Sequence, residues 1–315
     1  WFTTNYAKQK FIVYNLSILS SKIKELGTKY ITIPMLSRTH GQTASPTLLG
    51  KEIYVFYERL YNQFESLNNL KHYTKFGGAV GNFNAHYFAD DKIDWISLAD
   101  EFINSLELKR NKYTTQIDHY DNYSIVFDNL NRICIILVDF CRDIWQYISY
   151  GYFIQKVVKT ETGSSTMPHK VNPIDFENAE GNYLLASNLL QFFSRKLPIS
   201  RLQRDLTDST ITRNIGTAIA HMLIGIKSTQ KGLEKLSLNI NAIDKDLEEN
   251  NVVIAEGIQT LLRYVGVENS YEKVKELTRN NTNHISSSTL KEFIKTLDLE
   301  DCYVKKIEEL TAKNY

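Results

Sequence analysis

The sequence predicts an all-α protein with a central bundle of long helices and a small helical domain at its C-terminal end. Only five prolines interrupt the 315 residues, so the segments between them are long. Apolar residues recur in those segments at helical spacing, without the alternation that marks strands. Because 43% of the residues are hydrophobic, the chain can bury a core around which such helices pack.

Five long helices are expected in the bundle. The second is expected to begin at Pro46, with Ser45 as its cap, because proline suits the first helical position. The third is apolar almost all round, as in a helix that lies inside a bundle. The fifth carries small residues, among them Gly216 and Gly225, that let neighbouring helices approach closely. The expected helices cover residues 10–26, 46–73, 121–151, 174–196 and 209–236, and the second is expected to end near Gly77 and Gly78.

Shorter helical segments follow residue 262 and predict a second domain. They cover residues 270–280, 286–297 and 299–310, and polar turns separate them. We therefore expect a bundle domain over residues 1–262 and a small helical domain over residues 263–315. The first ten residues lead directly into a helix, with neither a signal peptide nor a cap. An N-terminal portion of the fold is therefore expected to precede them.

The charge balance excludes some classes of partner. The 37 basic and 36 acidic residues give a formal charge of +1, which provides no overall field for nucleic acid or a membrane surface. Apolar runs fall short of the roughly 18 residues that a membrane span needs. We expect neither nucleic acid nor a membrane as a partner.

The cysteines, Cys134, Cys141 and Cys302, are odd in number and lack the spacing of metal ligands. This pattern suits a reducing compartment better than a disulfide framework. We expect the cysteines to fill the core and the protein to be cytoplasmic. We also expect it to use neither a metal nor a cofactor.

The stretch GSSTMPHKVNP, residues 163–173, has the composition of a ligand-binding turn. Its glycine and serines make a flexible entry, and Asn172 with the proline after it signals a helix start. Four polar side chains can meet beside that helix N-terminus, where a carboxylate is favoured. They are Ser164, Ser165, Lys170 and Asn172. An ordinary linker rich in glycine and serine is the alternative interpretation.

A second candidate segment is SRTHGQTASP, residues 37–46, in which Thr39 and His40 precede the expected helix. Imidazole is the side chain whose charge changes near neutral pH, so it serves as a general acid. An isolated histidine before a helix is more often structural. The local sequence leaves both interpretations open.

A third segment, KLPISRLQRDLTDSTITRN at residues 196–214, gathers guanidiniums and hydroxyls. Ser209 and Arg213 are four apart and share a helix face. The planar fork of arginine binds phosphate oxygens bidentately. The segment therefore predicts a phosphate site, with a solvated basic face as the alternative. The candidate phosphate ligands are Arg201, Arg204, Ser209, Thr210 and Arg213.

The stretch at residues 163–173 resembles the GSSxMPxKxNP signature of the fumarase/aspartase superfamily, with every fixed position filled. The resemblance implies that Ser164 is the base that removes a Cβ proton, while Lys170 and Asn172 bind the substrate carboxylate. The R-T-H-G-Q pattern is matched as well. It implies that His40 is the general acid that protonates the departing purine nitrogen.

Within that superfamily the chain resembles the bacterial-type adenylosuccinate lyases over nearly its whole length, including KYTTQIDHYD and GGAVGNFNAH. The resemblance implies a carbon–nitrogen lyase of purine biosynthesis. It would release fumarate from adenylosuccinate, and from the succinylated imidazole-carboxamide ribotide. The nucleotide substrate would be bound by Thr39, Gln116, Ser165, Asn172, Asn178, Arg204, Ser209, Thr210 and Arg213.

The same resemblance implies a homotetramer whose active sites combine segments from three chains. It also implies an N-terminal region that supplies a second active-site histidine, and no counterpart stands before Trp1. Two alternatives stay open. One is another fumarate-releasing lyase, such as an argininosuccinate lyase, and the other is a catalytically silent helical scaffold.

Overall fold

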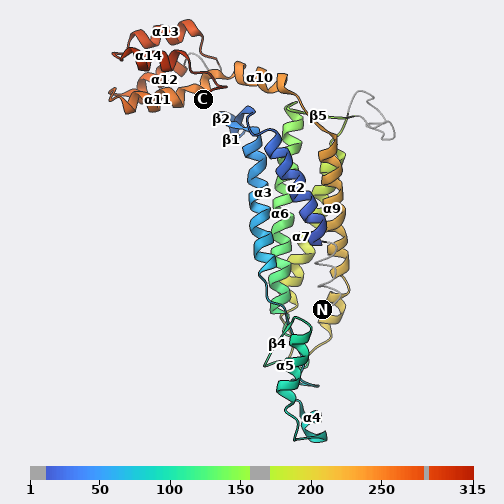
Figure 1. Ribbon diagram of the computed structural model, residues 1–315. Helices are drawn as coiled ribbons and strands as arrows, with labels where there is room; N and C mark the ends of the chain where they lie inside the picture. Colours follow the sequence, from blue (N-terminus) through green and yellow to red (C-terminus); the bar gives the residue numbers. More distant parts are fainter. Residues whose placement is uncertain (1–11, 157–170, 280–283) are drawn as a thin grey trace. The chain divides into compact units, whose positions relative to one another are not determined.

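The computed structural model describes residues 12–156, 171–279 and 284–315. The predicted all-α class is confirmed, because long helices make up most of the described chain (Figure 1). The long helices are α2 (Tyr14–Lys29), α3 (Leu49–Asn68), α6 (Asp121–Ser149), α7 (Ile174–Lys196) and α9 (Ile215–Lys235). None of the described helices combines the length with the apolar character that crossing a membrane requires.

Short elements complete the fold. Three helices lie between the long ones: α4 (Asn84–Ala89), α5 (Trp95–Ser105) and α8 (Thr207–Thr212). The C-terminal helices are α10 (Ile240–Glu249), the 3-10 helix η2 (Asn251–Ile254), α11 (Ala255–Tyr264), α12 (Ser270–Arg279), α13 (Ser287–Lys295) and α14 (Asp301–Glu308). The strands pair as β1 (Pro34–Thr39) with β2 (Gln42–Leu48), β3 (Tyr73–Thr74) with β4 (Lys109–Arg110), and β5 (Phe153–Gln155) with β6 (Leu236–Leu238).

The described residues group into two compact units. The first, called here the bundle unit, contains residues 12–23, 56–146 and 171–235. The second, called the hairpin unit, contains residues 24–55, 147–156, 236–279 and 284–315. Residue 262, where a domain boundary is expected from the sequence, lies inside α11. Residues 236–262 group with the C-terminal helices rather than with the bundle.

Helices α7 and α9 form an antiparallel pair in the bundle unit. The ring of Phe176, near the start of α7, packs on Gly232 near the end of α9. Farther along α7, the ring of Tyr183 packs on Gly225, where an added Cβ would lie 2.6 Å from a ring carbon. The expectation that small residues let these helices approach closely is therefore confirmed at Gly225.

The core of the bundle unit includes the apolar face of α6. Cys134 and Cys141 are buried there among leucine, isoleucine and phenylalanine. Burial raises the pKa of both thiols to about 12, so neither is a reactive thiolate at neutral pH. Cys302 is exposed, so the expectation that it fills the core is wrong.

Three expected helix boundaries differ from the structure. Helix α3 ends at Asn68, before the expected end near Gly77 and Gly78. The helix expected from Pro46 begins at Leu49, because residues 34–48 form a hairpin in which Pro46 pairs with Leu36. A proline is tolerated where its strand lies at the edge of a sheet. The helix expected over residues 209–236 is broken between α8 and α9, so Arg213 caps α8 instead of continuing into a long helix.

Candidate active site

The predicted general acid lies at the tip of the β1–β2 hairpin, in the hairpin unit. Thr39 pairs with Gln42, which leaves His40 and Gly41 as a two-residue turn. Both turn residues have positive φ, 54° at His40 and 74° at Gly41, as hairpins with type I′ turns require. Histidine is among the residues that enter this region more readily than most. The turn therefore presents Thr39 and His40 as exposed side chains.

Gln116 lies in the bundle unit beside the arginine-rich segment. Its backbone N–H donates to the carbonyl of Gln203 at 3.3 Å, which fixes the segment before α6 against the residues that precede α8. The Gln116 side chain is exposed. The structure thus places two segments of the predicted site together, although they lie far apart in the sequence.

Arg204 stands over a buried carboxylate at this end of the bundle unit. One nitrogen of its guanidinium lies 3.9 Å from Asp208 Oδ1, and the Tyr120 hydroxyl donates to Asp208 Oδ2 at 3.1 Å. Burial, together with the charge of Asp208, raises the pKa of Tyr120 to about 12. Tyr120 therefore stays a hydrogen-bond donor across the physiological range.

Tyr120 and Asp208 are absent from the residues predicted from sequence. Asp208 follows Arg204 by four positions, which is the spacing of a helical ion pair. This spacing was the feature of the sequence that could have pointed to Asp208. No comparable local signal pointed to Tyr120, because its contact with Asp208 joins segments 88 residues apart.

The predicted phosphate ligands lie on α8, at its C-terminal end and in the segment before it. Ser209 is half-buried within α8, while Thr210 and Arg213 are exposed. Arg201 is engaged with Asp205 at 3.0 Å. The hydrogen bonds from Thr207 hold the pKa of Asp205 below its usual range, so that carboxylate is charged. Arg204 and Arg213, together with two hydroxyls, remain the groups best suited to an incoming anion.

The asparagines lie at the other end of α7. Asn172 is half-buried just before the helix begins. Asn178 donates to Ser228 Oγ at 3.0 Å, and it borders a shallow hollow of about 450 Å³ on the α7–α9 pair. Ser164, Ser165 and Lys170, which the sequence places beside Asn172, lie outside the described residues.

Helix α7 separates the two groups of predicted site residues within the bundle unit. Asn178 faces Ser228 of α9, whereas Arg213 precedes the start of α9 at Ile215. A helix rises about 1.5 Å per residue, so the segment between Arg213 and Ser228 spans roughly 20 Å. Asn178 and the arginine cluster therefore do not meet in one bundle unit.

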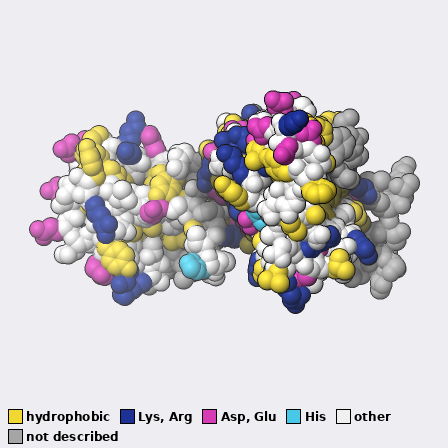
Figure 2. Space-filling view, turned by 90° about the horizontal axis from the view of Figure 1, so that it is seen from below, with side chains coloured by type: hydrophobic (Ala, Val, Ile, Leu, Met, Phe, Trp, Pro, Cys, Tyr) yellow, Lys and Arg dark blue, Asp and Glu magenta, His cyan; other side chains and the backbone are white. Residues whose placement is uncertain are grey.

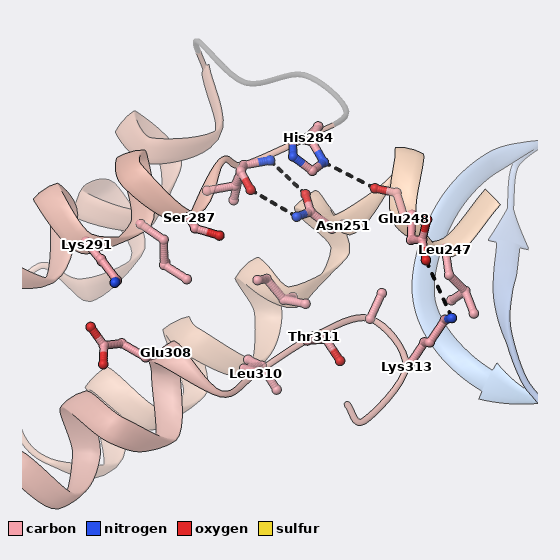
Figure 3. A pocket seen from close by; sticks show the side chains of 14 residues that line it. Leu247, Glu248, Asn251, His284, Ser287, Lys291, Glu308, Leu310, Thr311 and Lys313 are labelled. Atoms are coloured by element: carbon pink, nitrogen blue, oxygen red, sulfur yellow. Dashed lines mark hydrogen bonds and ion pairs between the residues drawn. The ribbon is translucent and has the colours of Figure 1, made fainter. Parts of the chain in front are cut away.

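A pocket of about 310 Å³ lies in the hairpin unit, between η2, α13 and the C-terminal segment (Figure 3). Asn251 spans it by bonding both the amide and the carbonyl of Ile285. None of the residues predicted for the active site lines this pocket.

Comparison with known proteins gives the class first. Residues 4–184, more than half of the chain, match the family model described as Lyase. Residues 200–315 match the model described as Adenylosuccinate lyase C-terminal. The chain belongs to the adenylosuccinate lyase family, as the resemblance of stretches such as KYTTQIDHYD and GGAVGNFNAH implies.

Curated proteins with similar sequences support the same family. The chain is 51% identical over 297 residues to adenylosuccinate lyase of Dictyostelium discoideum. This match covers 93% of this chain and 64% of that protein. It is 45% identical over 309 residues to the Haemophilus influenzae adenylosuccinate lyase, covering 98% of this chain and 67% of that protein. The chain thus spans about two thirds of the length of these relatives.

A solved structure shares the fold. The crystal structure of 3-carboxy-cis,cis-muconate lactonizing enzyme from Pseudomonas putida superposes with a TM-score of 0.77. The match covers 96% of this chain and 68% of that chain, at 19% sequence identity. At this identity the likeness concerns the fold alone.

Proposed function

We propose that the full-length protein is an adenylosuccinate lyase, which releases fumarate from adenylosuccinate to give AMP and acts likewise on the succinylated imidazole-carboxamide ribotide. The observation that carries the proposal is the cluster of arginines and hydroxyls on and around α8 in the bundle unit. The hairpin unit, taken by itself, presents His40 at an exposed two-residue turn. The family membership and the relatives' names support the proposal.

The proposed reaction divides between an acid and a base. Ser164 takes the Cβ proton, and the resulting carbanion is stabilised as an aci-carboxylate by Lys170 and Asn172. The C–N bond then breaks, and its electron pair leaves with the purine nitrogen, which His40 protonates. General acid catalysis of this kind typically contributes about 10² to 10⁴ in rate, and His40 is exposed at the hairpin tip where a substrate could reach it.

The nucleotide end of the substrate is assigned to the cluster around α8. Arg204 and Arg213 offer charge-assisted donors to the phosphate, and Ser209 and Thr210 add hydroxyls. Gln116 is held beside this cluster through its backbone. Asp208 Oδ1 lies 3.9 Å from a nitrogen of the Arg204 guanidinium.

We propose a homotetramer with shared active sites. Two features of the bundle unit support it. Asn178 and the arginine cluster lie at different ends of α7, so another copy would have to complete each site. Large apolar side chains are exposed, including Phe88 at 95%, Leu202 at 89% and Tyr113 at 90%. Figure 2 shows hydrophobic side chains at the surface among charged ones.

A cytoplasmic location is proposed for the same protein. The two cysteines buried in α6 are free thiols, and a reducing compartment keeps thiols in that state. The substrates assigned here are also nucleotides of central metabolism.

Ultraviolet absorbance of the full-length protein, mixed separately with adenylosuccinate and with argininosuccinate, tests the function. The purine spectrum should change with adenylosuccinate, while argininosuccinate should be left intact. Release of fumarate from argininosuccinate alone would favour the other superfamily lyase. No reaction with either substrate by folded protein would favour a silent scaffold.

A further inference from the structure

The β1–β2 hairpin needs external support, because two strands alone are marginally stable in water. Its tip, from Thr39 to Gln42, is exposed. Met35 and Leu36, near its base, are buried and anchor only that end. Any group that holds the hairpin close to its tip therefore decides where His40 lies.

Arg38 is that group on β1. It stands directly before Thr39, and its Nη2 lies 2.6 Å from Asp246 Oδ2 on α10. The two side chains are only 19% and 20% exposed, so water screens the pair less than it screens a surface pair. The guanidinium also lies over the ring of Tyr150, at 4.4 Å from the ring centroid. Arg38 is thus fixed in direction as well as in position.

Asp246 is the centre of this network. The Tyr152 hydroxyl donates to the same Oδ2 that pairs with Arg38, and Asn250 Nδ2 donates to Oδ1 at 3.0 Å. Both carboxylate oxygens therefore have partners from three different segments of the hairpin unit. Burial and the contact with Asp246 raise the pKa of Tyr152 well above its usual value, so that this donor stays protonated.

The second strand has a similar but looser support. Ser45 donates to Glu256 of α11, and the Tyr315 hydroxyl donates to the same carboxylate at 3.0 Å. Glu256 and Tyr315 are exposed, whereas Arg38 and Asp246 are half-buried. Ser45 also lies farther along the chain from His40 than Arg38 does. Asp246 is consequently the stronger determinant of the hairpin tip.

We infer that Asp246 is a positioning residue for the reaction, which holds the Thr39 and His40 hairpin through Arg38. The inference rests on the proposed role of His40 as general acid. Asp246 does not touch the substrate in this account. It fixes the direction from which the imidazole delivers its proton, and small displacements of an acid can cost about 10²-fold in rate.

The test compares Asp246→Asn with Asp244→Asn in the full-length protein. Asp244 lies on the same helix and pairs with Lys313 at 3.0 Å, away from the hairpin, so it is a matched control. Asp246→Asn should lower kcat by roughly 10- to 100-fold while KM changes less than about threefold, because the arginine cluster around α8, to which the phosphate is assigned, is untouched. Asp244→Asn should behave as wild type. A kcat for Asp246→Asn within about threefold of wild type would overturn the inference.

Coupling to Arg38 gives a second measurement. If Asp246 acts through Arg38, the double variant Arg38→Met with Asp246→Asn should lose no more activity than the worse single variant. Arg38→Lys keeps the charge without the planar fork, so its loss should be smaller than that of Arg38→Met. Additive losses would mean that the two residues act separately.

Hydrogen exchange separates positioning from general destabilisation and from failure of the proposed function. In Asp246→Asn, amides of residues 38–43 should exchange at least about tenfold faster, whereas those of α7 and α9 should not change. Equal acceleration throughout would show a merely structural role. If the wild-type protein does not turn over adenylosuccinate, the proposed function is wrong. Unchanged exchange at residues 38–43 in Asp246→Asn would reject the positioning inference, whatever the activity of the wild type.

Discussion

Asn178 and Arg213 lie at opposite ends of the α7–α9 pair. Asn178 lies near the start of α7 and contacts Ser228 of α9. Arg213 lies at the end of α8, the short helix that precedes α9. Two residues proposed to bind one substrate are therefore separated by roughly 20 Å of helix. A purine nucleotide bound by both groups requires that they come from different copies of the chain.

A homotetramer with shared active sites, in which His40 and Ser164 of one site come from different copies, is tested by complementation between two inactive variants. A His40→Asn protein lacks the acid and a Ser164→Ala protein lacks the base, so each should lose on the order of 10³ or more in turnover. Refolded together, the two should recover activity, because about a quarter of the sites would receive both intact residues. Each variant refolded alone is the control. Mixed oligomers without recovered activity would show that one chain supplies both residues.

The arginine cluster predicts a separation between binding and turnover. Arg204→Leu or Arg213→Leu should raise KM with a smaller effect on kcat, because a phosphate far from the reacting bond is bound equally in the ground state. Arg201→Leu is the comparison, since Arg201 is paired with Asp205. The phosphate assignment would fail if wild type handled a dephosphorylated substrate as well as the nucleotide.

Tyr120 predicts a loss of stability at alkaline pH. Its pKa is raised from 10.0 to about 12 in the folded protein, so its contribution is complete below pH 10 and disappears as the pH rises towards about 12. Tyr120→Phe should therefore reduce the loss of unfolding free energy between about pH 9 and about pH 11, by on the order of 1 kcal/mol. Urea denaturation at each pH measures the unfolding free energy of both proteins. Tyr113→Phe, at an exposed ring, should leave the wild-type dependence intact.

The buried pair of Asp175 and Lys235 predicts a large effect on stability. Their charged atoms lie 2.6 Å apart, and the side chains are 7% and 10% exposed. Lys235→Met should cost about 3–5 kcal/mol, because the carboxylate loses its nearest partner in a buried site. Lys231 approaches Asp175 at 3.6 Å but is 54% exposed. Lys231→Met should therefore cost less than about 1 kcal/mol in the same urea titration.

Helical periodicity accounts for how much of the fold could be predicted. Helix α6 follows from apolar residues at positions such as Ile133 and Leu137, and α7 follows from the proline before Ile174. The hairpin was missed because Ser45 and Pro46 also form a good helix start. The sequence held a contrary signal, since His40 and Gly41 are suited to a two-residue turn.

The candidate site was predictable where its residues are close in sequence. Ser209 and Arg213 share a short helix and its end, as their spacing indicates. The contacts of Arg38 with Asp246 and of Tyr120 with Asp208 join segments 208 and 88 residues apart. Such contacts depend on how the helices pack, and a single sequence carries no local pattern for them.

The left-handed backbone at His40 gives position 40 two independent requirements. Its side chain must carry an exchangeable proton, and its backbone must accept a conformation that is strained for a β-branched residue. Replacement by valine or isoleucine would remove the proton and distort the turn together, so lost activity would have two inseparable causes. Asparagine accepts this conformation readily. A histidine-to-asparagine change therefore dissects the chemistry of the acid from the geometry that carries it.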